Sequence, residues 1–94
     1  MRIVWSERAL SDLSEIEAYI ARDNPTAGLA VKQYIMTPVR GLAAMPLMGR
    51  PGRVHESREL VIARLPYIVA YRVLDNRAEI LAVIHGARQW PEAF

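Results

Sequence analysis

The chain has 94 residues, no cysteine and a formal net charge of +2. A chain of this length forms one small domain, here residues 1–94, whose core is near the lower limit for independent stability. The absence of cysteine excludes disulfides, thiol catalysis and cysteine-bound metal, and no apolar run reaches the roughly 18 residues that cross a membrane. We therefore expect a soluble cytoplasmic protein that uses neither a cofactor nor a metal.

The charge is unevenly distributed along the chain. Residues 1–31 carry a net charge of −2, whereas residues 32–94 carry +4. Eleven of the twelve cationic residues are arginine, whose planar guanidinium binds phosphates and carboxylates in a fixed geometry. The small total argues against broad non-specific coating of DNA. It is compatible with one local anionic partner.

The chain begins with a short predicted strand at residues 1–5, followed by a helix at residues 7–22. Ser6 is a suitable N-cap, and Glu7 places a carboxylate in the first turn. Apolar residues then recur at positions 9, 13, 16 and 20, which is the spacing of one helical face. We expect this face to pack on the rest of the molecule.

A second helix is predicted to start at Pro25, with Asn24 as its cap. Pro38 lies inside the helical pattern, so we expect a kink there or a break at Thr37. The tight connection between the two helices predicts an antiparallel helical hairpin. The apolar face of the second helix consists of Ala27, Val31, Tyr34, Ile35, Val39 and Leu42.

The second half of the chain predicts three strands. Residues 45–52 contain two prolines and two glycines and are expected to form a loop. A strand follows from about residue 58 to residue 63, and residues 67–73 and 79–85 form a hairpin around Asp75-Asn76-Arg77. The order is β-α-α-β-β-β. This predicts the α+β class, with a small antiparallel sheet and the N-terminal helical hairpin packed on one face.

Both strands of the last hairpin are apolar at nearly every position, so we expect central strands covered on both faces. A turn at residues 75–76 fixes which residues face one another. The predicted pairs are Arg72 with Glu79, Ala70 with Leu81 and Ile68 with Val83. These three pairs would lie on the face of the sheet away from the helices, with His85 at the far end of the same face. The face beneath the helices would hold Tyr67, Val69, Tyr71, Val73, Ile80, Ala82 and Ile84.

Polar and aromatic side chains gather after this hairpin. Arg88 either binds a phosphate or a partner's carboxylate, or it is a solvated arginine that holds a local carbonyl. His85 is either a structural residue or a general acid–base group, because an imidazole titrates near neutral pH. Trp90 is either an interface anchor or, like Phe94, packs the C-terminus against the fold.

A second group of candidates is rich in arginine. Four arginines fall within fifteen residues, namely Arg50, Arg53, Arg58 and Arg64. They form either a binding surface for an anionic partner or an ordinary charged surface with Glu56 and Glu59 as partners. Arg72 opposite Glu79 is most simply a cross-strand ion pair.

Five segments form a pattern along nearly the whole chain: Trp5 with Ala9, Leu13, Ile16 and Tyr19-Ile20; Met48–Val54; Arg58–Val61; Pro66–Val73; and His85–Pro91. With these segments the chain resembles the RelE/ParE superfamily of bacterial type II toxin–antitoxin toxins. The resemblance implies the β-α-α-β-β-β fold. It also implies a cognate antitoxin whose C-terminal segment folds around the toxin, in a higher-order toxin–antitoxin complex.

The resemblance implies two alternative targets. RelE-like members cut mRNA in the ribosomal A site with basic residues on the sheet and a C-terminal aromatic hydroxyl or histidine, whereas ParE-like members poison DNA gyrase and lack that set. Arg88 matches the RelE-type arginine of the last loop. The position of the strand arginine is Ile68, and the terminal tyrosine position is Phe94. The lysines of the preceding strand have no counterpart, because Lys32 is the only lysine.

RNA cleavage by 2′-hydroxyl attack needs a base, an acid and a group that stabilises phosphorane charge. Arg88 suits the last role and His85 at best one of the others, so we predict a non-enzymatic, ParE-like toxin that binds DNA gyrase. The alternatives are a ribosome-dependent endoribonuclease with Arg88, His85 and Arg64 as catalytic candidates, and an antitoxin-binding module without activity. The residues predicted to bind the target or partner are Arg50, Arg53, Arg58, Arg64, Arg72, His85, Arg88, Trp90 and Phe94.

Overall fold

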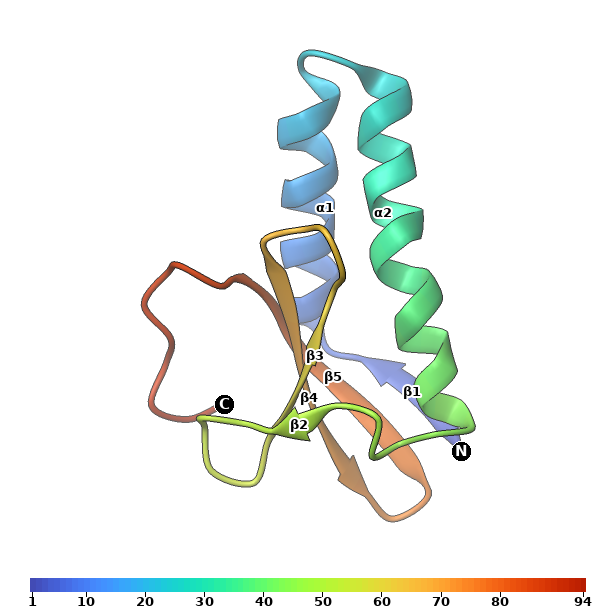
Figure 1. The fold of residues 1–94 in the computed structure, drawn as a ribbon, viewed down its shortest axis with the longest axis vertical. Coiled ribbons are helices and arrows are strands. Elements are labelled where there is room, and N and C mark those ends of the chain that lie inside the picture. Colours follow the sequence, from blue (N-terminus) through green and yellow to red (C-terminus); the bar gives the residue numbers. More distant parts are fainter.

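The computed structural model describes residues 1–94, in which two helices pack on one face of a five-stranded sheet (Figure 1). The elements are β1 (Arg2–Trp5), α1 (Glu7–Ala21), α2 (Pro25–Arg40), a short 3-10 helix η1 (Gly41–Ala43), β2 (Arg50–Pro51), β3 (Arg58–Val61), β4 (Tyr67–Leu74) and β5 (Arg77–His85). The α+β class and the predicted order of elements are confirmed. The additional strand β2 lies within the segment that was predicted to be a loop.

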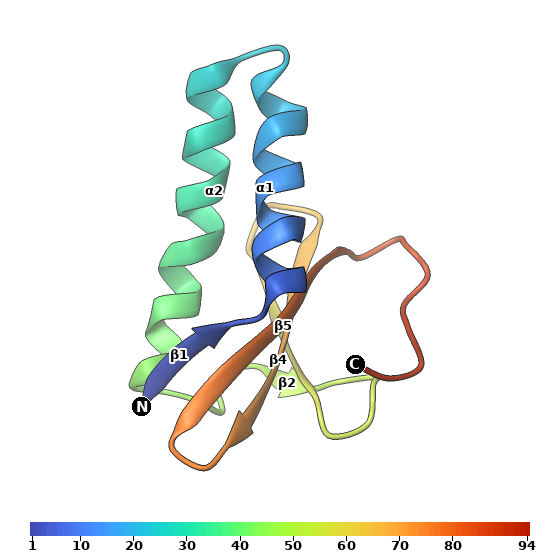
Figure 2. The ribbon, with the colours of Figure 1, turned by 180° about the vertical axis from the view of Figure 1, so that it is seen from behind.

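The strand order across the sheet is β1-β5-β4-β3-β2, so β4 and β5 are central as predicted. The sheet is mixed rather than wholly antiparallel, because β1 runs parallel to β5 while all other neighbours are antiparallel. Figure 2 shows β1 beside β5 at the edge far from β2. The sequence pattern does not reveal this direction, since a parallel or an antiparallel neighbour covers an apolar strand equally well.

Helix α1 begins at its predicted cap. The Ser6 hydroxyl oxygen accepts a hydrogen bond from the Ala9 amide at 3.0 Å and donates one to the Leu81 carbonyl at 3.1 Å. Ala9 and Leu13 are buried on the predicted face. One side chain therefore starts the helix and also attaches it to β5.

Helix α2 continues through Pro38 to Arg40, so the predicted break at Thr37 is wrong. The Thr37 hydroxyl donates to the Gln33 carbonyl at 2.9 Å. Ile35 and Val39, on either side of the proline, have no exposed surface. Burial of both turns against the sheet outweighs the one backbone hydrogen bond that a proline removes.

The two helices approach most closely at Gly28. A Cβ atom at this position would lie 2.7 Å from the Glu17 carbonyl oxygen and 2.9 Å from the Ala21 Cβ. A side chain of any size would therefore push the helices apart. Lys32 pairs with Glu17 at 3.6 Å across the same interface. Neither α1 nor α2 has the length and apolar composition that a membrane-spanning helix requires.

The main core lies between the helices and the sheet. Trp5 packs against its edge, and its buried members are Ala9, Leu13, Ile35, Val39, Leu42, Leu60, Ile62, Val69, Tyr71, Ala78, Ile80 and Val83. A smaller apolar cluster on the opposite face consists of Ala70, Ala82 and Ile84, with Trp90 packed against it. The middle of β4 and β5 is therefore covered on both faces, as predicted. We call the face that carries the smaller cluster the open face.

A β-bulge in β5 corrects the predicted register. Arg72 pairs with Glu79 as expected, but the register shifts beyond Tyr71 because Leu81 is an extra residue without a partner. The predicted pairs of Ala70 with Leu81 and of Ile68 with Val83 are therefore wrong. The observed pairs are Ala70 with Ala82 and Ile68 with Ile84.

The bulge also changes which side chains lie beneath the helices, because one extra residue reverses the alternation of faces. Ala82 and Ile84, predicted to face the helices, lie on the open face, and Val83 joins the main core instead. His85, predicted for the face away from the helices, pairs with Tyr67 and lies on the helix side, in a cleft beside α1.

Candidate binding surfaces

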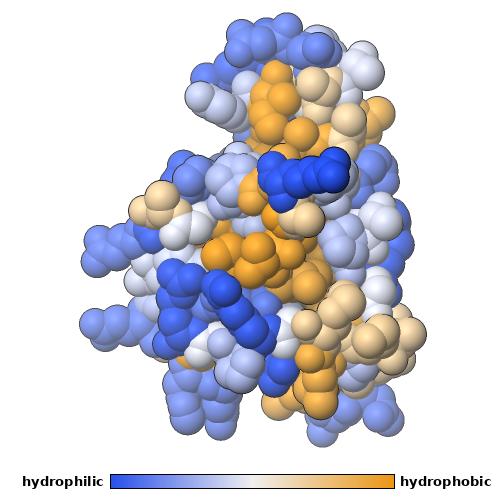
Figure 3. All heavy atoms as spheres, in the orientation of Figure 1, coloured by the Kyte–Doolittle hydropathy of each residue, from blue (hydrophilic) through white to orange (hydrophobic).

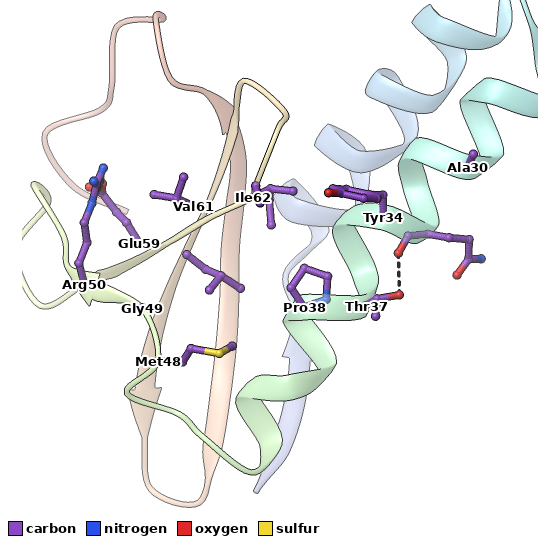
Figure 4. Close-up of a pocket in the computed structure, with 13 residues that line it drawn as sticks. Ala30, Tyr34, Thr37, Pro38, Met48, Gly49, Arg50, Glu59, Val61 and Ile62 are labelled. Carbon is purple, nitrogen blue, oxygen red and sulfur yellow. Dashed lines mark hydrogen bonds and ion pairs between the residues drawn. The ribbon is translucent and has the colours of Figure 1, made fainter.

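A concave surface with a volume of about 990 Å³ runs between α2 and the outer edge of β3 (Figure 4). We call it the apolar groove. Its α2 wall consists of Ala30, Gln33, Tyr34, Thr37 and Pro38, and its sheet wall of Met48, Gly49, Arg50, Glu59, Leu60, Val61, Ile62 and Ala63. Figure 3 shows hydrophobic residues gathered over this region and continuing along the helices.

The apolar groove presents large side chains without cover. Tyr34, Met48 and Val61 are 46%, 43% and 51% exposed. Figure 4 shows Tyr34 and Pro38 directed toward Ile62, whereas Val61 stands on the other side of its strand. Exposed, contiguous apolar surface of this kind is a candidate binding site.

The groove also contains an unpaired strand edge. β2 pairs only with Arg58 and Glu59, which leaves the rest of β3 without an outer neighbour. The Ile62 amide donates to the Tyr67 carbonyl and so faces β4. Because backbone groups alternate in direction along a strand, those of Val61 point outward. Such an edge can accept a strand from another polypeptide.

The loop that closes one end of the groove is held from the core. The hydroxyl of fully buried Tyr71 accepts from the Gly49 amide at 2.9 Å and donates to the Pro46 carbonyl at 2.8 Å. Arg58 donates to the carbonyls of Leu47 and Gly49 at 3.2 and 2.6 Å. Arg58, predicted to bind a partner, thus holds the loop of its own chain.

Arg50 and Arg53, which were also predicted to bind a partner, share one buried carboxylate. Glu59, with a side chain only 2% exposed, accepts from Arg50 Nη2 at 2.9 Å and from the backbone amide and Nε of Arg53 at 2.8 and 3.0 Å. The Arg53 guanidinium stacks on the Trp90 ring at 3.9 Å. Burial alone would raise the pKa of the Glu59 carboxyl, but hydrogen bonds from Arg53 and Arg50 outweigh it and lower that pKa.

A second carboxylate joins two arginines near the turn of the last hairpin. Glu79 accepts from Arg72 Nε at 2.6 Å, as predicted, and from Arg77 Nε at 2.9 Å. The hydrogen bonds from Arg72 and then Arg77 lower the pKa of the Glu79 carboxyl. The predicted cross-strand ion pair between Arg72 and Glu79 is thereby confirmed. Its terminal guanidinium nitrogens make no hydrogen bond to the protein and stay available to a partner.

A second concave surface lies between α1 and the end of β5 and has a volume of about 690 Å³. We call it the polar cleft. It is lined by Asp12, Glu15, Ile16, Ala18, Tyr19, Arg22, Pro66, Tyr67, Val83, His85 and Arg88. The Asp12 carboxylate accepts from the Val83 amide at 2.9 Å, beyond the last residue that β1 pairs. A side chain of α1 therefore replaces a strand partner on this stretch of β5.

His85 and Arg88 both line the polar cleft. The His85 Nδ1 accepts from the Ala87 amide at 3.1 Å, and the ring meets Tyr67 edge-on with centroids 5.8 Å apart. In the neutral ring the hydrogen therefore resides on Nε2. Arg88 is exposed and has no ion-pair partner, whereas Arg22 on the opposite wall stacks on Tyr19.

The remaining candidates are dispersed. Arg64 is exposed in the turn between β3 and β4, with a positive φ of 67°, and lines neither concave surface. Phe94 lies 5.7 Å from the Arg8 guanidinium. The sequence placed Tyr34 on the apolar face of the second helix together with Ile35, but its side chain is half-exposed and lines the apolar groove. One signal was available: Tyr34 and Ile35 are adjacent, so they lie about 100° apart around a helix and face different surroundings.

Residues 3–90 match the family described as the ParE toxin of the type II toxin–antitoxin system parDE. The chain belongs to this family. As a ParE/RelE toxin of a type II system, it has a cognate antitoxin as its partner.

Individual similar proteins match nearly the whole chain. Y4kP of Sinorhizobium fredii is 50% identical over 91 residues, which are 97% of this chain and 94% of the relative. The toxin RelE2 of Caulobacter vibrioides is 36% identical over 87 residues, 93% of this chain and 97% of the relative. A chain of the chromosomal ParDE toxin–antitoxin system from P. aeruginosa superposes with a TM-score of 0.81 at 30% identity, covering 90% of this chain and 95% of that one.

Proposed function

We propose that this ParE-family toxin arrests growth by binding DNA gyrase rather than by cutting RNA. We further propose that its antitoxin silences it by occupying the apolar groove. The observation that carries the first proposal is the environment of His85. Nδ1 accepts from the Ala87 amide, so the neutral ring carries its hydrogen on Nε2 and has no free lone pair to act as a base.

RNA cleavage needs both an acid and a base beside the scissile phosphate. Phe94 has no hydroxyl to serve as the second group, and its ring lies beside Arg8 of α1. Arg88 is left as a free cation in a cleft that also contains the carboxylates of Asp12 and Glu15. A surface with charges of both signs and the exposed Tyr19 suits a folded protein partner better than a polyanionic RNA.

The target can be tested with purified components. The toxin is incubated with DNA gyrase, ATP and supercoiled plasmid, and in parallel with ribosomes programmed with a defined mRNA. Accumulation of cleaved, linear plasmid is the result expected for gyrase poisoning. Specific cuts in the mRNA at the A site, without any effect on the plasmid, would overturn the proposal.

The competing function is a ribosome-dependent endoribonuclease. The observation that favours it is that His85 and Arg88, two of its three catalytic candidates, line one cleft. A nuclease that uses His85 would lose activity on replacement of the imidazole by an amide. The His85→Gln toxin is therefore tested in both assays. A gyrase poison keeps most of its activity, because the amide preserves a polar side chain at the cleft wall.

The second proposal concerns the antitoxin. The apolar groove offers uncovered apolar side chains on α2 and an outward-facing backbone at Val61 on the sheet. An extended antitoxin segment can pair with this edge and direct alternate side chains toward Tyr34 and Pro38. Burial of this surface in the complex raises the melting temperature of the toxin by mass action.

A groove variant tests this docking site. Tyr34→Glu introduces a charge into the apolar groove, whereas Leu10→Glu introduces the same charge at a half-exposed apolar position of α1 outside both concave surfaces. The antitoxin used is the product of the reading frame beside that of this toxin. We expect Tyr34→Glu alone to weaken its binding and to escape neutralisation in cells. Equal neutralisation of both variants would place the antitoxin elsewhere.

A further inference from the structure

We propose that the apolar groove selects its antitoxin through one carboxylate, which binds Arg50 on the open-face side of the docked segment. This inference rests on the proposed docking of the antitoxin in the groove. It adds a chemical requirement that the apolar walls alone do not impose. Arg50 would then be the residue that determines specificity, and Glu59 the residue that positions it.

The first argument is the local charge balance. The Glu59 carboxylate is shared by the guanidinium groups of Arg50 and Arg53, and neither arginine has another acidic partner. The cluster therefore carries a surplus of one positive charge. The surplus lies at the edge of the groove, where the side chain of Arg50 is 55% exposed.

The second argument is that the two arginines are not equivalent. Arg53 binds Glu59 through its backbone amide and its side chain, and its guanidinium plane is covered by Trp90. Arg50 uses only Nε and Nη2, both toward the same Glu59 oxygen. A guanidinium has five N–H donors, so most of those on Arg50 remain available to a ligand. Arg50 is therefore held in place by Glu59, but most of its N–H donors have no hydrogen-bond acceptor.

The third argument comes from the strand edge. β2 occupies the edge of β3 at Arg58 and Glu59, so a segment that pairs at Val61 would lie next to Arg50. Side chains of a strand alternate between its two faces. Figure 4 shows Tyr34, Pro38 and Ile62 on one side of β3, with Arg50, Glu59 and Val61 on the other. The docked segment would therefore place apolar side chains toward α2 and a carboxylate toward Arg50.

This arrangement also discriminates against other segments. A docked segment without a carboxylate would cover the surplus cation and remove part of its hydration without replacing it, which costs binding free energy. An aspartate or glutamate would instead complete a cluster of two guanidinium groups and two carboxylates. Charge-assisted hydrogen bonds of this kind are stronger than neutral ones and have a defined geometry.

The experiment measures the affinity of the toxin for the product of the neighbouring reading frame. Arg50→Gln removes the charge while Arg53 still holds Glu59, so the variant keeps the fold. The matched control is Arg40→Gln, an exposed arginine of α2 without an ion pair. We expect the Kd of Arg50→Gln to rise about tenfold or more at low salt and less at high salt. The control leaves the Kd unchanged.

A double-mutant cycle identifies the carboxylate. Each Asp and Glu of the antitoxin's C-terminal segment is changed to its amide and measured against wild-type toxin and Arg50→Gln. We expect one position whose change weakens wild-type binding but has no further effect on Arg50→Gln. Arginine at that position should restore binding to Arg50→Glu. A purely structural Arg50 would lower the melting temperature of the toxin without coupling to any antitoxin residue.

The outcomes separate the two levels of the proposal. No complex between wild-type toxin and the neighbouring product would refute the proposed antitoxin. A complex insensitive to Tyr34→Glu would refute docking in the groove. A complex sensitive to Tyr34→Glu but unchanged by Arg50→Gln, at either salt concentration, would overturn the carboxylate requirement and leave the docking site intact.

Discussion

The apolar groove and the polar cleft lie on the two sides of the helical hairpin and differ in how the chain holds them. The groove is apolar, and the loop at its end is fixed by buried groups, chiefly the Tyr71 hydroxyl and the Glu59 carboxylate. The cleft is polar, and its free cation Arg88 lies on a short loop beyond β5. The loop of the groove is therefore tied to the core by several hydrogen bonds, whereas the Arg88 side chain of the cleft has no bound partner.

This comparison also explains why the arginines divide into two groups. Those near the groove are bound to carboxylates or carbonyls of their own chain, whereas Arg88 has no such partner. A guanidinium that is already bound is fixed in orientation, and an unbound one can follow its ligand. Loss of the groups that hold the groove loop, Glu59 and the Tyr71 hydroxyl, should therefore affect stability, whereas loss of the Arg88 side chain in the cleft should affect activity alone.

The largest effect on stability is expected from Glu59→Gln. An amide cannot neutralise the two guanidinium groups and retains only part of their hydrogen bonding, so we expect a loss of about 3 kcal/mol of unfolding free energy. Urea denaturation measures it. Glu79→Gln is the matched control, because Glu79 also binds two arginines but is more exposed, with 19% of its side chain accessible. Equal losses in the two variants would contradict the special position of Glu59.

Removal of the Tyr71 hydroxyl should have the next largest effect. Tyr71→Phe keeps the ring in the core but leaves the buried Gly49 amide without an acceptor, which costs about 2 kcal/mol. Amide hydrogen exchange at Gly49 should accelerate. The Val83 amide, which donates to Asp12 beside the cleft, should accelerate no more than the loss of global stability accounts for. Uniform acceleration at both amides would mean that the loop is not held separately.

The pH dependence of stability should be smaller but diagnostic. The folded-state pKa of Glu59 lies below its ordinary value of 4.5, so the unfolded chain takes up a proton first as the pH falls. The stabilisation is complete above pH 4.5 and is lost as the pH falls through the lower folded-state value. We expect the unfolding free energy of Glu59→Gln to decline less below pH 4.5 than that of the wild type. Parallel curves would contradict the assignment.

The smallest effect on stability is expected in the polar cleft. Arg88→Ala removes an exposed side chain without an ion pair, so the unfolding free energy should change by less than about 0.5 kcal/mol. Growth arrest on induction should nevertheless weaken, because the free cation is the proposed contact with the target. Full toxicity of a variant with a normal melting temperature would remove Arg88 from the binding surface.

Local patterns in the sequence were sufficient for most of the fold. The helix caps at Ser6 and Asn24, the order of elements and the pair Arg72–Glu79 all depend on residues close in sequence. The face of His85 could not be predicted, because it depends on the bulge at Leu81, which lies where β5 contacts Ser6 and Asp12, more than 70 residues away. The apolar groove could not be predicted for the same reason, because its two walls come from segments that are separate in the sequence.

The sequence alone therefore determined the α+β class, the helical hairpin, the central hairpin of the sheet and the resemblance to a toxin family, because period, capping and turn chemistry are local. Only the tertiary structure decided which arginines are bound and which are free. It did so by burying Glu59 between Arg50 and Arg53 and by leaving Arg88 beyond the last strand. The reason is that ion pairs depend on distance in space, and the packing of the sheet determines which charged side chains lie close enough to pair.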